Sequence, residues 1–156
     1  MRLIMICLII CIVLMPVALS ASLENAKVVY RFFNTRNGVF LFTISKQEKQ
    51  SVENNCPWYN FEGKKFYVFP EEEADTVPVY RFWNTRNGTY LYTISEQERD
   101  AVMQLPHYNY EGIKFYVHET QSGDSIPVYR FWNTRSGAFL YTISEQEKDY
   151  IINNLD

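Results

Sequence analysis

The sequence predicts an α+β fold, mainly antiparallel β, in which three tandem β-β-α-β repeats pack in a pseudo-threefold closed arrangement, either trefoil-like or propeller-like. The segment at residues 29–38 recurs at 79–88 and again at 128–137, so the copies start 50 and 49 residues apart. Hydrophobic residues make up 47% of the chain, which is enough to bury a core. A repeat this short cannot bury its own apolar face, so the units must share an interior.

The first segment reads as an export signal. Arg2 gives a positive start, residues 3–13 form an unbroken apolar run, and the small residues Ala18 and Ser20 suit cleavage just before Ala21. We therefore predict a signal peptide at 1–20, a repeat domain at 21–156 and a secreted, extracellular protein. The alternative is a permanent membrane anchor, because the apolar stretch is of borderline length for spanning a bilayer.

After removal of residues 1–20, Cys56 is the one remaining cysteine, so no internal disulfide is expected. The remaining domain divides into repeat one at 27–76, repeat two at 77–125 and a partial repeat three at 126–156.

In the first repeat, residues 28–34 are rich in aromatic and β-branched residues and predict a strand. Residues 35–38 form a hairpin turn, with Gly38 free to take positive φ, and 39–44 form the second strand. Ser45 followed by Glu48 matches a capping box, which starts a helix.

The same Ser-x-x-Glu pattern occurs in each repeat, and the helices are expected at 46–55, 96–105 and 145–155. A third strand follows near 63–68 and 112–117. The third repeat has no such strand after its helix, which predicts an unpaired sheet edge. Two explanations stay open: a truncated product, or completion by strand exchange between chains.

The run Tyr-Arg-Phe-x-Asn-x-x-x-Gly, then Tyr-Thr-x-Ser-x-x-Glu, then Tyr-x-Tyr-Glu-Gly-x-x-Phe-Tyr-Val, resembles a tandem repeat of uncharacterised function. That repeat occurs in secreted proteins and is often appended to extracellular hydrolases, peptidases or glycosidases. The resemblance implies one compact domain of three repeats with an accessory or sugar-binding role. The family often carries His two residues after the turn glycine, but here those positions are Phe40, Tyr90 and Phe139. Any role of that His in metal or ligand binding is therefore not expected.

Strand alternation places one arginine and one aromatic residue on a common face of the first strand of each repeat. An aromatic plate can stack on a sugar, and a guanidinium can donate to hydroxyls or carboxylates. The arginines of the hairpin turns are exposed cations that could contact an acidic glycan. The predicted ligand-binding residues are Arg31, Phe33, Arg81, Trp83, Arg130, Trp132, Arg36, Arg86 and Arg135. The alternative is structural: Arg31 stacks on Phe33, and its counterparts do likewise, between units.

Other polar residues have simpler interpretations. Glu48 and its counterparts Glu98 and Glu147 are explained by the capping box, whereas Glu62 and Glu111 are expected to pair with Arg31 and Arg81. His107 and His118 do not recur between repeats, so no metal site is expected. Asn87-Gly88-Thr89 matches a glycosylation sequon, which matters only in a eukaryotic source.

The net charge of −3 argues against nucleic-acid binding. The sequence has no nucleophile–base set, no metal-ligand cluster and no phosphate-binding glycine loop, so neither an enzyme nor a cofactor is predicted. The leading hypothesis is a lectin-like, non-catalytic binding module for glycans or a cell surface. The alternatives are a protein-binding accessory or inhibitor of a secreted enzyme, and a purely structural repeat. No membrane association is expected once the signal has been removed.

Overall fold

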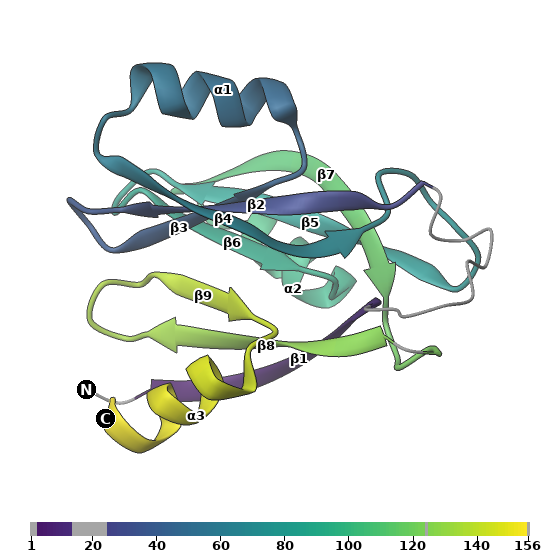
Figure 1. The fold of residues 1–156 in the computed structure, drawn as a ribbon. Helices are drawn as coiled ribbons and strands as arrows, with labels where there is room; N and C mark the ends of the chain where they lie inside the picture. The colour runs from purple at the N-terminus through teal and green to yellow at the C-terminus, as the bar shows by residue number, and fades with distance from the viewer. Residues whose placement is uncertain (1–2, 14–24, 124, 156) are drawn as a thin grey trace.

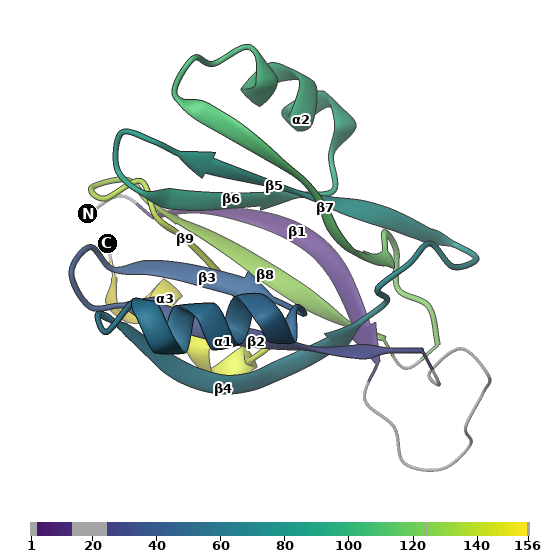
Figure 2. The same cartoon turned by 90° about the horizontal axis from the view of Figure 1, so that it is seen from above.

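Antiparallel strands dominate the computed structural model, which describes residues 3–13, 25–123 and 125–155, and three short helices lie on its outside (Figure 1). Seen from above, the helices sit on different flanks of the strands rather than in one layer (Figure 2). The predicted α+β class with mainly antiparallel strands is therefore confirmed.

The first unit contains β2 (Lys27–Asn34), β3 (Val39–Thr43), α1 (Lys46–Asn55) and β4 (Tyr59–Val68). Strands β2 and β3 form the predicted hairpin, and Gly38 at its turn has a φ of +72°. Strand β4 pairs with the other edge of β2 and begins earlier than the sequence predicted. The unit is thus a three-stranded sheet with the order β3-β2-β4 and one helix.

The second unit repeats this plan with β5 (Thr76–Asn84), β6 (Thr89–Thr93), α2 (Glu96–Met103) and β7 (Tyr108–His118). Its pairings are the same, with β5 between β6 and β7. The common plan follows from the common sequence, because the first strand of both units carries the same run of four buried residues, at 29–32 and 79–82.

The third unit contains β8 (Ser125–Asn133), β9 (Phe139–Thr142) and α3 (Glu145–Asn154). The strand on the other side of β8 is β1 (Leu3–Val13), which pairs antiparallel with β8 along most of its length. Among the described residues no strand follows α3, as predicted, but the predicted unpaired edge of the third unit is wrong because β1 occupies it. The strand comes from the N-terminal apolar run, which the sequence analysis assigned to the signal peptide.

The predicted closed arrangement, trefoil-like or propeller-like, is also wrong. The sheets are open: one has the order β6-β5-β7-β1-β8-β9 and the other the order β3-β2-β4. Strand β1 pairs with both β7 and β8, which merges the second and third units into one sheet and leaves the first apart. Side-chain contacts and one isolated backbone bridge, between Phe69 and Tyr116, connect the first unit to the second.

The three helices begin as the capping boxes predict, but only half of each box forms. The hydroxyls of Ser45, Ser95 and Ser144 accept from the backbone N–H three residues on. The Ser45 N–H does not bond Glu48; it donates to Thr43 Oγ1 at 3.0 Å, and the other two units repeat this bond. The glutamate carboxylates are therefore free for another role.

The units share one interior. The largest buried cluster takes Val29 and Phe42 from the first unit, Val79 and Tyr92 from the second and Tyr141 from the third. The rings of Phe42, Tyr92 and Tyr141 contact one another edge-on, with centroids 5.5–5.7 Å apart. Burial of apolar surface thus holds the repeats together, as the short repeat length requires.

The predicted signal cleavage before Ala21 lies outside the described residues, and it stays a prediction. None of the helices described is long and apolar enough to cross a membrane.

Candidate functional site

The arginines on the first strand of each unit are buried. Arg31, Arg81 and Arg130 are 7%, 5% and 3% exposed. Each guanidinium makes two hydrogen bonds to a glutamate of a different unit, the one that lies three residues after that unit's capping serine. Arg31 reaches Glu147 at 3.1 and 3.2 Å, Arg81 reaches Glu48 at 2.7 and 3.1 Å, and Arg130 reaches Glu98 at 2.8 and 3.2 Å. These arginines therefore join units rather than face solvent.

A second carboxylate completes the first two of these sites. The Nε of Arg31 donates to Glu62, and the Nε of Arg81 donates to Glu111, both at 2.5 Å. The expected pairing of Glu62 and Glu111 with the repeated arginines is confirmed. Arg130 differs, because its Nε is buried without a partner among the described residues.

Each buried arginine also lies over an aromatic ring, but not over the one expected from its own strand. Arg31 lies 5.2 Å from the centroid of Phe40, and Arg81 and Arg130 have equivalent positions over Tyr90 and Phe139. The residue that stacks therefore comes from the second strand of the hairpin and not from Phe33 or its counterparts. Sequence alternation alone does not show this cross-strand neighbour.

The electrostatics agree with a structural role. Burial raises the pKa of Glu48, but hydrogen bonds and charge from Arg81 outweigh it, so the pKa lies below its ordinary value. Burial also raises the pKa of Glu147. The hydrogen bonds and charge of Arg31 lower it by more, so the pKa of Glu147 lies below its ordinary value. For Arg81, burial lowers the pKa, but Tyr92 and Glu48 bring it above the usual value. Both partners of the Arg81–Glu48 pair are therefore charged at neutral pH.

The three predicted aromatic plates lie on partly accessible surface. Trp83 is 36% exposed, and Phe33 and Trp132 are half-buried. Each packs beside the second hairpin strand: Phe33 lies 5.1 Å from Phe40, and Trp132 is stacked on Phe139 at 6.3 Å. The arginine donors on the same face are buried and engaged with carboxylates of other units, so the predicted fork-and-plate pairs do not form a common open site.

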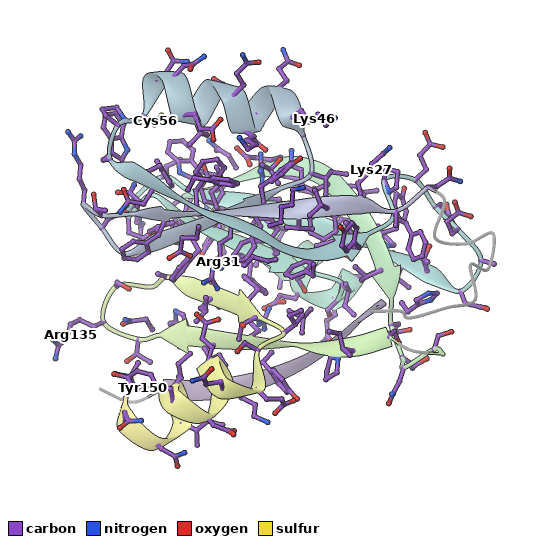
Figure 3. All side chains as sticks on the ribbon, in the orientation of Figure 1. Lys27, Arg31, Lys46, Cys56, Arg135 and Tyr150 are labelled. Atoms are coloured by element: carbon purple, nitrogen blue, oxygen red, sulfur yellow. The ribbon has the colours of Figure 1, made fainter. Side chains whose placement is uncertain are left out.

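The turn arginines have a different setting. Arg36, Arg86 and Arg135 are exposed and lie in the hairpin turns, which Figure 1 shows at one end of the molecule. In each turn the backbone N–H of the arginine donates to the side-chain oxygen of the asparagine two residues earlier, at 2.9–3.0 Å, which fixes the turn. The Arg135 side chain points away from the body of the protein (Figure 3).

The turns are also linked to one another. The Asn37 side chain donates to the Asn87 carbonyl at 3.4 Å, and the Asn87 side chain donates to the Ser136 carbonyl at 3.2 Å. Three exposed guanidinium groups are therefore carried on connected turns. We call Arg36, Arg86 and Arg135 the basic tip.

One residue of this region escaped the sequence analysis. Trp58 lies under Arg36, whose guanidinium carbon is 4.1 Å from the ring centroid. Its carbonyl accepts from both the N–H and the hydroxyl of Thr35, which ties the start of β4 to the first turn. The second repeat has His107 at the position equivalent to Trp58. Because the tryptophan does not recur, the comparison of repeats gave no sign of its role.

Two further residues were missed. The Tyr92 hydroxyl donates to the Phe42 carbonyl at 2.8 Å and accepts from the Phe42 N–H at 2.9 Å. Tyr141 bonds the Tyr92 backbone in the same way, at 2.7 and 2.8 Å. Burial raises the pKa of both tyrosines, so both hydroxyls stay neutral. These residues join the second strands of neighbouring hairpins.

The part of the chain that the structure describes has no group of three or more His, Cys, Asp or Glu side chains placed to hold a metal ion. The His118 ring lies 3.0 Å from the Asp75 carbonyl. Cys56 is a free, half-buried thiol.

A family model described as a domain of unknown function (DUF5648) matches residues 28–156. This range covers all three repeats and leaves out the N-terminal apolar run. Neither a curated protein nor a solved structure matches the chain.

Proposed function

We propose that this chain, which belongs to the family of the domain of unknown function DUF5648, is a secreted, non-catalytic module that binds anionic glycans through the basic tip. The observation that carries the proposal is the linkage of the turns. Hydrogen bonds from Asn37 and Asn87 hold three exposed arginines on adjoining turns, although the chain as a whole has a net charge of −3. Sulfate and carboxylate groups match the planar guanidinium donors.

Accessible aromatic rings near the same hairpins support a carbohydrate ligand over a simple anion. Trp83 and Trp132 lie one residue before the asparagine that begins each turn, and Trp58 lies under Arg36. An indole ring offers an apolar face to a sugar ring while a nearby arginine pairs with its charged group. Several weak sites on one rigid end favour a ligand that itself repeats.

The buried arginines are assigned no ligand in this proposal. Arg31, Arg81 and Arg130 direct their guanidinium groups to carboxylates inside the protein, and breaking such pairs would cost stability. The carboxylates of Glu48, Glu98 and Glu147 are engaged in the same pairs, which supports a role without catalysis.

A second candidate function is a protein-binding accessory of a secreted enzyme. It is favoured by exposed apolar side chains on the third strands of the first two units. Phe61 and Tyr67 lie exposed on β4, and Tyr110 and Ile113 lie exposed on β7. Since β4 is also an edge strand, a protein could bind it by strand addition.

Binding of the full chain to immobilised heparin and to a glycan array tests the first proposal. The variant R36A/R86A/R135A should elute at clearly lower salt and lose array signal, because it removes the basic tip. The control K27A/K46A/K64A removes the same number of exposed positive charges elsewhere and should elute near the parent. Equal losses in both variants would show only general charge attraction and would contradict the proposal.

A further variant separates the aromatic contribution. Trp83→Ala should reduce binding to sulfated oligosaccharides but not to inorganic sulfate. If the array shows no glycan binding and a secreted protein is captured instead, with loss of capture in F61S/Y67S, the second candidate replaces the first. Absence of either ligand would favour a purely structural repeat.

A further inference from the structure

The strand position beside β8 is filled differently from the equivalent positions in the other units. In the first unit Asn34 pairs with Tyr59 and Phe32 with Phe61. In the third unit Asn133 pairs with Leu3 and Phe131 with Met5. Strand β1 therefore runs in the same direction and register as β4, although its sequence is unrelated.

The register shows which residues stand in for the repeat motif. The residue after Phe61 is Glu62, and the residue after Met5 is Ile6. Ile6 pairs with Arg130 in the ladder. An isoleucine has no hydrogen-bond acceptor in its side chain, so β1 brings no carboxylate to Arg130.

Arg130 shows the consequence. Glu62 and Glu111 accept from the Nε of Arg31 and Arg81, whereas the Nε of Arg130 is buried with no partner among the described residues. Arg130 is only 3% exposed, so water does not replace the missing acceptor freely. A buried, unsatisfied donor on a charged group is costly. The site is therefore built for a carboxylate that β1 does not supply.

A pocket beside β8 is a second, independent sign that β1 does not supply the side chains for which this site is built. In the first unit Phe32, Leu41 and Val52 form a cluster against which Tyr59 packs, and Tyr108 packs in the same way in the second unit. The third-unit counterparts of the three cluster residues are Phe131, Leu140 and Ile151. They line an apolar pocket of about 280 Å³ together with Phe40 of the first unit. The volume is far above the roughly 10–15 Å³ of such space that a single water needs.

We propose that the β8 edge and this pocket form a docking site for a partner polypeptide that presents an extended Tyr-x-aromatic-Glu-Gly segment in place of β1. The tyrosine enters the pocket between Phe131 and Phe40, and the glutamate accepts from the Arg130 Nε. Backbone pairing with β8 gives affinity, and these two side chains give specificity. The glycine follows the glutamate, as Gly63 and Gly112 do with φ of +90° and +85°.

The occupant is a strand of this chemistry rather than any apolar segment, because two different features of the site require it. An apolar strand satisfies the ladder, as β1 does, but leaves Arg130 unpaired. A small apolar ligand fills the pocket but supplies neither backbone pairing nor charge. If residues 1–20 are removed as the sequence predicts, β1 is lost and the edge becomes fully open to this partner.

The test uses the full chain and a fluorescein-labelled peptide with the sequence of residues 58–68. We expect saturable binding by anisotropy, weakened about tenfold by Gln in place of the peptide glutamate, since the hydrogen bond to Arg130 then loses the carboxylate charge. Replacing the peptide's first tyrosine by alanine should weaken binding to a similar extent. A chain with Ile6→Pro and Ile10→Pro should bind the peptide more tightly, because proline removes β1 ladder bonds.

A second measurement keeps the test sharp if the free peptide aggregates. The sequence of residues 58–68 is joined directly after residue 156 of the full chain, and its thermal midpoint is compared with the same graft carrying Gln. The graft with glutamate should melt at higher temperature, and Arg130→Met, which removes both the charge and the Nε donor, should abolish the difference between the two grafts. Equal midpoints, or equal binding of the Glu and Gln peptides, would overturn the proposal. Dimers of the chain that the peptide does not dissociate would also overturn it, because a second copy would then occupy the edge.

Discussion

The Nη2 of Arg81 lies 2.7 Å from Glu48 Oε1, so the first strand of the second unit is fixed to the helix start of the first. The same relationship joins Arg130 to Glu98 and Arg31 to Glu147. Because Arg81 also bonds Glu111 of its own unit, one guanidinium connects three elements. Such a planar fork cannot be replaced by an ammonium group.

We therefore expect Arg81→Lys to lower the free energy of unfolding by about 2 kcal/mol, since Glu48 loses its bidentate partner and Glu111 loses the Nε donor. Chemical unfolding followed by tryptophan fluorescence measures the change. Arg86→Lys is the control, because Arg86 is exposed in a hairpin turn, and its midpoint should stay that of the parent. A parent-like midpoint for Arg81→Lys would show that the pair contributes no net stability.

Acid should loosen the contacts between units. The pKa values of Glu48 and Glu147 are lowered in the folded protein despite burial, because Arg81 and Arg31 favour the charged carboxylates. Their stabilisation is thus present above the unfolded pKa of about 4.3 and is lost as pH falls through the folded values. The denaturant midpoint should decline below about pH 5 and flatten in E48Q/E147Q. An equally steep acid decline in that variant would assign the effect to other groups.

The tyrosine bridge makes a third prediction. Tyr141→Phe removes the hydroxyl that satisfies both the N–H and the carbonyl of Tyr92, and should cost about 2 kcal/mol. Tyr67→Phe removes a hydroxyl from a ring that is 48% exposed and should leave stability unchanged. Thermal unfolding compares the two variants. Similar midpoints would mean that water replaces the lost hydroxyl in the interior.

The turns offer a test of the basic tip that leaves its arginines in place. A Cβ added at Gly137 would lie 2.5 Å from Asn87 Nδ2, whereas one added at Gly38 would meet nothing within 4 Å. Both glycines have φ near +73°, so both alanine variants carry the same backbone strain of about 1 kcal/mol. Only Gly137→Ala should also displace Asn87 and lower the salt needed to elute the chain from heparin. Equal elution of the two variants would show that heparin binding does not depend on the hydrogen bond that links the turns.

Much of the fold could be predicted from the sequence because the repeat fixes local structure three times. Each hairpin, each helix start and the shared interior follow from residues that recur, such as Gly38 and Ser45. The closure could not be predicted correctly, because it depends on which strands pair between units. The role of residues 3–13 was also hidden, since an apolar run suits both an export signal and a buried strand.

The candidate site was only partly accessible to sequence reasoning. The alternation that placed Arg31 beside Phe33 is real, but burial decides whether a side chain meets a ligand or a neighbouring unit. The glutamate at the position of Glu48 and the arginine at the position of Arg81 both occur in every unit. This joint recurrence was the available sign of an ion pair. The capping-box interpretation hid that sign, because it accounted for the glutamate within its own helix.

Asn87 has one more consequence, for the choice of expression host. It begins the sequon Asn87-Gly88-Thr89, and its Nδ2 is the atom to which an oligosaccharide is attached. The same nitrogen now donates to the Ser136 carbonyl, while Thr89 donates to Asn87 Oδ1 at 2.8 Å. An oligosaccharide attached there in a eukaryotic secretory pathway would take the place of this hydrogen bond between two hairpins, so bacterial material is the appropriate reagent for studying this end of the molecule.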